Sequence, residues 1–148
     1  LIEKGVPIQW WSDEVTASDI EVMKVARDPA WQAEFELLAI LISIRIWASM
    51  LKCGKVVIHG DAKSALHAAR RMAGRSPALN ALAGELGVTC EVHSIEIEVK
   101  HLPGSVNVQA DAISRLTDGK KQIPASLVQV KRVKPPVRDS SFFEVMIK

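Results

Sequence analysis

The sequence has no apolar run long enough to cross a lipid bilayer. The longest such run, residues 37–44, contains Ser43 and is followed by Arg45, whereas a spanning helix needs about 20 apolar residues. The chain also lacks a signal-peptide pattern, which would combine a charged start, an apolar segment and a small-residue cleavage site. We therefore expect an intracellular protein, in the cytoplasm or the nucleus, with no membrane partner.

Cysteine is scarce and offers no metal site. The 148 residues include two cysteines, Cys53 and Cys90, and their separation matches no metal-ligand spacing. We expect ordinary reduced thiols, as is usual inside cells. With 48% hydrophobic and 24% charged residues, a chain of this length is predicted to form one globular domain with a sizeable core.

The positive charge is concentrated near the C-terminus. The whole chain carries +2, and residues 119–148 carry seven Lys/Arg against two Asp/Glu, which leaves 12 against 15, or −3, for residues 1–118. Residues 119–148 also contain three prolines and show no apolar period. We interpret them as a linker or tail outside the core, with Phe142 and Phe143 as a candidate docking segment. Such a tail can neutralise phosphates or act only as a solubilising linker.

Apolar patterns and capping residues predict an α/β order of elements with at least one parallel crossover and no internal repeat. Near the start we expect half of a hairpin in residues 1–15 and a short helix capped by Thr16. Further helices are expected at 29–52, at 62–73, from Pro77 and at 105–116, and strands are expected at 55–60 and 95–100.

Local signals fix several boundaries of these elements. The pairs Asp28-Pro29 and Ser76-Pro77 each combine a capping acceptor with a proline at the first helical position. Gly54 is expected to take the left-handed position after the helix at 29–52. The β-branched run at 55–60 lies between glycines and predicts a buried strand. Local rules end the helix that begins at Pro77 at Gly87.

Three carboxylates stand out by their positions. Glu36 lies on the long apolar helix, Asp61 ends the strand at 55–60, and Asp111 lies in the last helix. Ligands bind beyond the carboxyl ends of parallel strands, and carboxylates gathered there need a divalent cation to offset their repulsion. From the residues alone three alternatives stay open, and the one for Asp111 is an ordinary surface acid. Glu36 fits a helix-start acid favoured by the helix dipole, and Asp61 fits a cap for the following helix.

Residues 100–116, KHLPGSVNVQADAISRL, combine a strand end, a sharp loop and a helix start. Asn107 and Asp111 are one helical turn apart, so both are expected to project from one face, with His101 nearby. A carboxylate and an amide beside a histidine are typical of metal and phosphate chemistry. The stretch resembles the last motif of the ribonuclease H domain in retrotransposon polyproteins, which reads His-x-Pro-Gly, then Asn, then Ala-Asp-x-x-Ser-Arg.

The resemblance extends over residues 1–116 and implies a ribonuclease H-like mixed sheet, flanked by helices, with strand order 3-2-1-4-5. Glu36, within a Glu-Leu-x-Ala motif, Asp61 and Asp111 match three of the family's four acidic metal ligands. His101 matches a mobile histidine that assists product release or proton transfer, and Asn107 matches a residue near the substrate backbone. The family resemblance also implies that the helix from Pro77 continues past Gly87.

The activity implied by the resemblance is two-metal hydrolysis of RNA in RNA–DNA hybrids, with Mg²⁺ or Mn²⁺, as part of a reverse transcriptase polyprotein. The implied partners are the hybrid and the reverse transcriptase portion of the same polyprotein. Lys63, His67, Arg70 and Arg71 share one helix face. We name Lys63 and Arg70 as candidate nucleic-acid contacts, with a solvated basic face as the alternative.

The family's first strand, with its Asp-x-Ser and Gly-rich turn, has no match in this chain, which begins at Leu1 rather than Met. We expect that central strand and the fourth acid to lie upstream. Residues 1–118 are then an incomplete ribonuclease H-like domain, residues 119–148 a basic tail, and cleavage by the chain alone weak or absent. The alternative function is a non-catalytic nucleic-acid-binding or spacer remnant of a retroelement.

Overall fold

The computed structural model describes residues 1–119 and 121–145 as a mixed α/β chain that divides into two compact units. We call residues 1–14 with 104–135 the small unit, and residues 15–103 with the segment from residue 136 onward the large unit. Each unit is described separately below. The predicted domain boundary after residue 118 stays a prediction.

The small unit is built from short strands. β1 (Ile2–Glu3) and β2 (Val6–Pro7) pair antiparallel, so both arms of a short hairpin are present where the sequence indicated half of one. β3 (Gln9–Trp10) pairs in parallel with β6 (Lys131–Arg132). The unit also contains the helix α5 (Val108–Ser114) and the 3-10 turn η2 (Ala125–Leu127). β6 and η2 lie where the sequence showed no period, so the local pattern missed them.

Trp10 organises the interior of the small unit. Its side chain is 5% exposed, and its indole Nε1 donates a hydrogen bond of 3.1 Å to the carbonyl oxygen of Val130. The guanidinium of Arg132 lies 4.9 Å from the Trp10 ring centroid. These contacts join the start of the chain to a segment about 120 residues later, which short-range sequence patterns cannot reveal.

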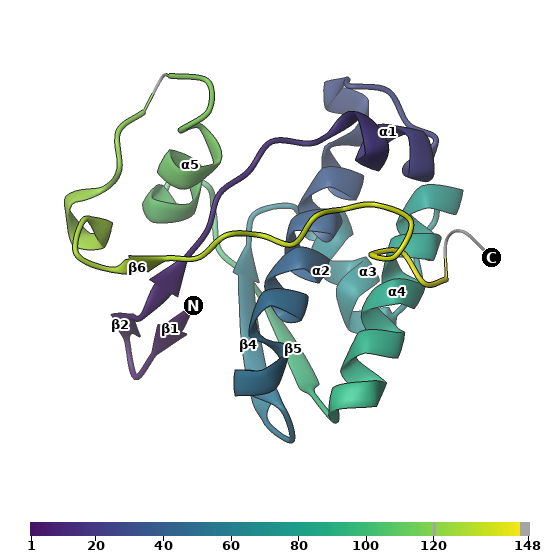
Figure 1. Ribbon diagram of the computed structural model, residues 1–148, viewed down its shortest axis with the longest axis horizontal. Helices are drawn as coiled ribbons and strands as arrows, with labels where there is room; N and C mark the ends of the chain where they lie inside the picture. The colour runs from purple at the N-terminus through teal and green to yellow at the C-terminus, as the bar shows by residue number, and fades with distance from the viewer. Residues whose placement is uncertain (120, 146–148) are drawn as a thin grey trace. The chain divides into compact units, whose positions relative to one another are not determined.

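The large unit places helices against a parallel strand pair (Figure 1). Its elements are α1 (Ala17–Met23), η1 (Pro29–Trp31), α2 (Gln32–Leu51), β4 (Lys55–Gly60), α3 (Lys63–Arg71), α4 (Pro77–His93) and β5 (Glu96–His101). β4 and β5 pair in parallel over six residues each, which confirms the predicted crossover through α3 and α4.

The predicted helix starts are confirmed by their capping bonds. Thr16 and Asp19 form a full capping box at α1, and Asp28 and Ser76 cap η1 and α4 from positions directly before prolines. α4 continues past Gly87 to His93, as the family resemblance implied and local rules did not. These starts were predictable because each depends on hydrogen bonds between residues two or three positions apart.

Two expectations about the segment after α2 are wrong. The residue with positive φ is Cys53, at 58°, and not Gly54; the Cys53 N–H donates to the carbonyl oxygen of His93 at 3.0 Å, which ties this turn to the end of α4. β4 is not a buried strand, because its residues alternate between exposed and half-buried. Lys55 on its exposed face forms a 3.0 Å ion pair with Glu98 of β5.

The interior of the large unit is formed where α2, α3 and α4 pack together, and the C-terminal segment contributes to it. Phe142 is 6% exposed, Phe143 1% and Arg138 6%. The expectation that all of residues 119–148 stay outside the core is therefore wrong for these three residues, and also for Leu127 of the small unit, which is 3% exposed. Among the residues described, none of the helices has the length and hydropathy of a membrane span.

Candidate functional site

Glu36 and Asp61 lie close enough in the large unit for their charges to interact. Glu36 projects from α2, and Asp61 follows the last residue of β4. Burial raises the pKa of Glu36 above its ordinary value, a hydrogen bond from Gln32 lowers it, and the negative charge of Asp61 raises it further. Two of the three predicted acids are thus brought together from different elements.

The local structure weakens the alternative role of each acid. Glu36 lies outside the first turn of α2, where Glu34 is the acidic residue, so the dipole at the helix start does not explain its position. The N-cap of α3 is Ala62, which makes no side-chain capping bond, so Asp61 does not cap that helix. Neither carboxylate therefore has the structural role that its sequence context allowed.

Gln32 is a partner of Glu36 that the sequence interpretation missed. Its Nε2 donates a 2.8 Å hydrogen bond to Oε1 of Glu36 from one helical turn earlier. The i, i+4 spacing on a helix was a sufficient signal for this contact. The bond orients the Glu36 carboxylate, whose second oxygen makes no hydrogen bond or ion pair with another described residue.

His101 lies at the same end of the parallel pair as Asp61. It is the last residue of β5 and is in register with Gly60, the residue directly before Asp61. Its side chain is exposed. The end of the strand pair therefore carries an acid on one strand and an imidazole on the other.

Asn107 and Asp111 belong to the small unit. Asn107 is the N-cap of α5 and makes no side-chain capping bond, and Asp111 lies in the first turn. The Asp111 carboxylate forms ion pairs with Arg115 at 2.8 Å and Lys121 at 3.7 Å. Within the described ranges, no three His, Cys, Asp or Glu side chains form a group that could hold a metal ion. The convergence of Asp111 with Glu36 and Asp61 stays a prediction.

Known protein families, curated proteins and solved structures contain no match to this chain. The function is therefore inferred from the chain's own residues.

A basic surface begins directly after Asp61. Lys63 and Arg70 are exposed on α3, together with His67 and Arg71, whose side chains approach within 3.4 Å of each other. Residues 62–84 contain no Asp or Glu. An exposed helix face with cations and no acids can contact a phosphate backbone.

We expect the substitution Asp61→Asn to lower the pKa of Glu36 toward its ordinary value, because it removes the repulsion and leaves burial as the remaining upward influence. The measurement is an NMR titration of the Glu36 side-chain carboxyl carbon. Glu91→Gln is the matched control. Glu91 is exposed near the C-terminal end of α4, whereas Ser76, which caps the opposite end of α4, donates a hydrogen bond to Glu34 of α2. An unchanged Glu36 pKa in Asp61→Asn would show that the two carboxylates do not interact.

The sign of the linked stability effect follows from the raised pKa. The folded protein holds the Glu36 proton more tightly than the unfolded chain does. The free energy of unfolding therefore falls as the pH rises from the ordinary to the raised pKa, and the loss is complete above the raised value. Glu36→Gln should remove that part of the pH dependence.

Proposed function

We propose that this chain is a ribonuclease H-type domain of a retroelement reverse transcriptase polyprotein, which hydrolyses RNA in RNA–DNA hybrids with Mg²⁺ or Mn²⁺. The feature that carries the proposal is that Glu36, on a helix, and Asp61, at the carboxyl end of a parallel strand pair, lie within reach of each other's charge. Enzymes with open α/β sheets place their ligands at this end.

The carboxylate pair fits a divalent cation. Burial and Asp61 both oppose ionisation of Glu36, and a cation held between the two acids would offset that cost. Carboxylate oxygens are ligands that Mg²⁺ accepts. In the proposal Glu36, Asp61 and Asp111 hold the metal ions, which in such sites activate water and stabilise the leaving oxygen.

The remaining candidates act on the substrate rather than on the metal. His101, exposed at the end of β5, is proposed to assist product release or proton transfer. Asn107 is proposed to contact the substrate backbone. Lys63 and Arg70 are proposed to contact phosphates along the exposed face of α3, where each contact would contribute affinity without sequence preference.

The ribonuclease H-like sheet is also part of the proposal. Among the described residues, β4 pairs with β5 on one edge and with no strand on the other. That second edge offers unpaired backbone groups to the central strand of the family. Because the chain matches three of the four family acids, we expect the chain alone to cleave slowly or not at all.

The test is cleavage of a labelled RNA–DNA hybrid in Mg²⁺. The present chain is compared with a version extended before Leu1 by an Asp-containing strand, and a DNA duplex serves as the control substrate. We expect the extended version to cut the RNA strand and the present chain to be far slower. Equal rates would contradict the three-ligand argument. Binding of the hybrid without cleavage by the folded extended version would contradict the nuclease proposal and favour a non-catalytic nucleic-acid-binding module.

A further inference from the structure

Residues 138–145, which we call the strap, pass over α2 and beside α4 of the large unit (Figure 1) and are bonded to α1 through Asp19. Its first anchor is Arg138, whose Nε donates to both carboxylate oxygens of Asp19 at 2.8 and 2.9 Å. Asp19 is 0% exposed. A fully buried carboxylate on α1 therefore receives its cation from the strap.

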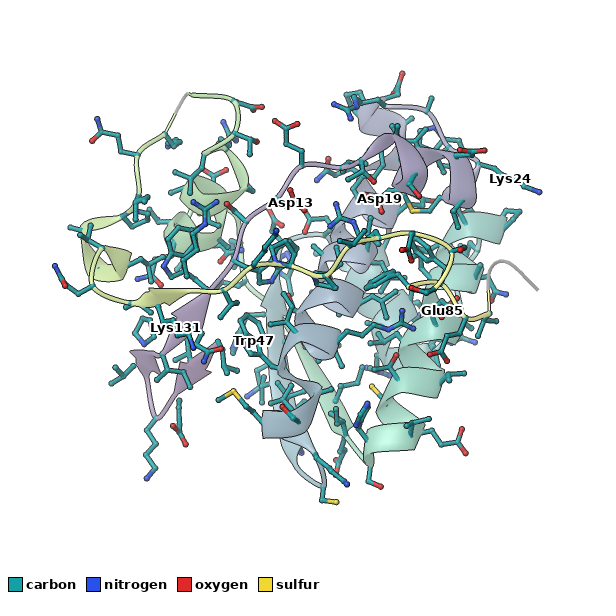
Figure 2. All side chains as sticks on the ribbon, viewed as in Figure 1. Asp13, Asp19, Lys24, Trp47, Glu85 and Lys131 are labelled. Carbon is teal, nitrogen blue, oxygen red and sulfur yellow. The ribbon has the colours of Figure 1, made fainter. Side chains whose placement is uncertain are left out.

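The second anchor is Glu85 of α4, whose side chain is also 0% exposed (Figure 2). Its carboxylate accepts hydrogen bonds from the backbone N–H groups of Glu144 at 3.1 Å and Val145 at 2.5 Å. It also accepts from Arg45 of α2 at 2.9 Å. The Glu85 carboxylate thus binds the strap through two backbone N–H groups of the strap.

Two aromatic rings fill the space between the anchors. Phe142 and Phe143 are buried, and their rings meet edge to face with centroids 4.9 Å apart. Arg45 lies 4.6 Å from the Phe142 ring centroid and donates to the Phe142 carbonyl oxygen. The site therefore recognises a cation, two aromatic side chains and a stretch of main chain in a fixed order.

The strap is joined to the rest of the chain by a tether with few contacts. Residues 134–137 make no hydrogen bond or ion pair with another described residue, and Val137 is 75% exposed. Two of the four tether residues are prolines, which donate no backbone hydrogen bond. The strap thus contacts the large unit as a bound peptide would, and it is joined to the preceding residues by a segment that resembles a linker.

We propose that the large unit carries a docking site for an Arg-x₃-Phe-Phe segment, and that this site accepts the strap of a second copy of the chain as well as its own. The strap makes the same contacts whether it binds its own large unit or that of a second copy. The effective concentration of the tethered strap, compared with the concentration of the second copy, therefore sets which of the two forms is populated. Two chains that exchange straps would each complete the other's large unit. This inference does not depend on nuclease activity.

The first test replaces the strap in the full-length protein. A protease site is inserted into the tether, the chain is cut, and a fluorescent synthetic peptide of residues 136–145 is added. We expect the strap fragment to stay bound after cutting and the labelled peptide to displace it. A peptide with Arg138→Gln should bind about 100-fold more weakly, since the buried Asp19 loses its cation. A Ser140→Ala peptide is the matched control, because Ser140 is exposed. Failure of the labelled peptide to bind the folded, cut protein would overturn the proposal.

The second test forces exchange between chains by charge reversal. In the Asp19→Arg variant two cations meet within one chain, and in the Arg138→Glu variant two anions meet. When the two variants are mixed, opposite charges meet at both docking sites only if the chains exchange straps. We expect a one-to-one dimer in the mixture by light scattering, and a monomer for the Asp19→Arg/Arg138→Glu double variant. A mixture that remains monomeric while both chains are folded would overturn the exchange. If a single variant does not fold, the peptide displacement decides the question.

Discussion

Replacing Arg138 with alanine is expected to lower the free energy of unfolding of the large unit by about 3–5 kcal/mol. Asp19 is 0% exposed, and the Arg138 Nε lies within 2.9 Å of both its oxygens. The variant would leave that carboxylate buried with the backbone N–H of Thr16, at 2.7 Å, as a remaining partner. The expected loss is a large share of a typical domain stability of about 5–15 kcal/mol.

The measurement is urea unfolding followed by the far-ultraviolet circular dichroism of the helices, since α1, α2, α3 and α4 all belong to the large unit. Arg70→Ala is the matched control on an exposed helix face, with an expected change within about 0.5 kcal/mol. Asp19→Asn/Arg138→Ala should be more stable than Arg138→Ala alone, because no charge then remains buried without its partner. Equal effects of Arg138→Ala and Arg70→Ala would refute the buried ion pair.

Asp61→Asn is expected to reduce Mg²⁺-dependent cleavage by the strand-extended protein about 100-fold or more. The amide keeps the size of the side chain but removes one of the charges that would hold the metal. Since Asp61 also raises the pKa of Glu36, the same substitution should favour ionised Glu36, so the loss cannot come from protonation of that residue.

The readout is kcat/KM on the hybrid at saturating Mg²⁺, with urea unfolding of the same variant to confirm that it is folded. Glu91→Gln is the control for removing a surface acid from the large unit, and its rate should stay within about twofold. A folded Asp61→Asn variant that retains full activity would remove Asp61 from the proposed ligand set.

The helix starts were predictable from the sequence because their causes are local. Thr16 with Asp19, Asp28 with Ala30, and Ser76 with Leu79 are hydrogen-bonded across two or three residues. The path of α4 through Gly87 was not predictable from local rules. An added Cβ there would meet the Met72 side chain at 3.6 Å, which shows that the glycine faces a neighbouring element rather than ending the helix.

The strap was not predictable because its contacts are between distant residues. Arg138 and Asp19 are 119 positions apart, and no period in residues 119–148 marks the anchor. For the candidate site, position in the sequence indicated Glu36 and Asp61, and the fold brings them within electrostatic reach. The exposure of β4 on one face was missed because β-branched runs do not indicate how many faces of a strand are covered.

The order of synthesis gives the strap a further consequence. Asp19 is made 119 residues before Arg138, an interval of about 6–24 s at about 5–20 residues per second. Once His101 has been made, the ribosome-bound chain contains all the described helices and strands of the large unit, but it still lacks the cation that neutralises Asp19. The large unit therefore completes its packing after translation has passed residue 143, and a nascent chain paused before that point should be the form most in need of a chaperone.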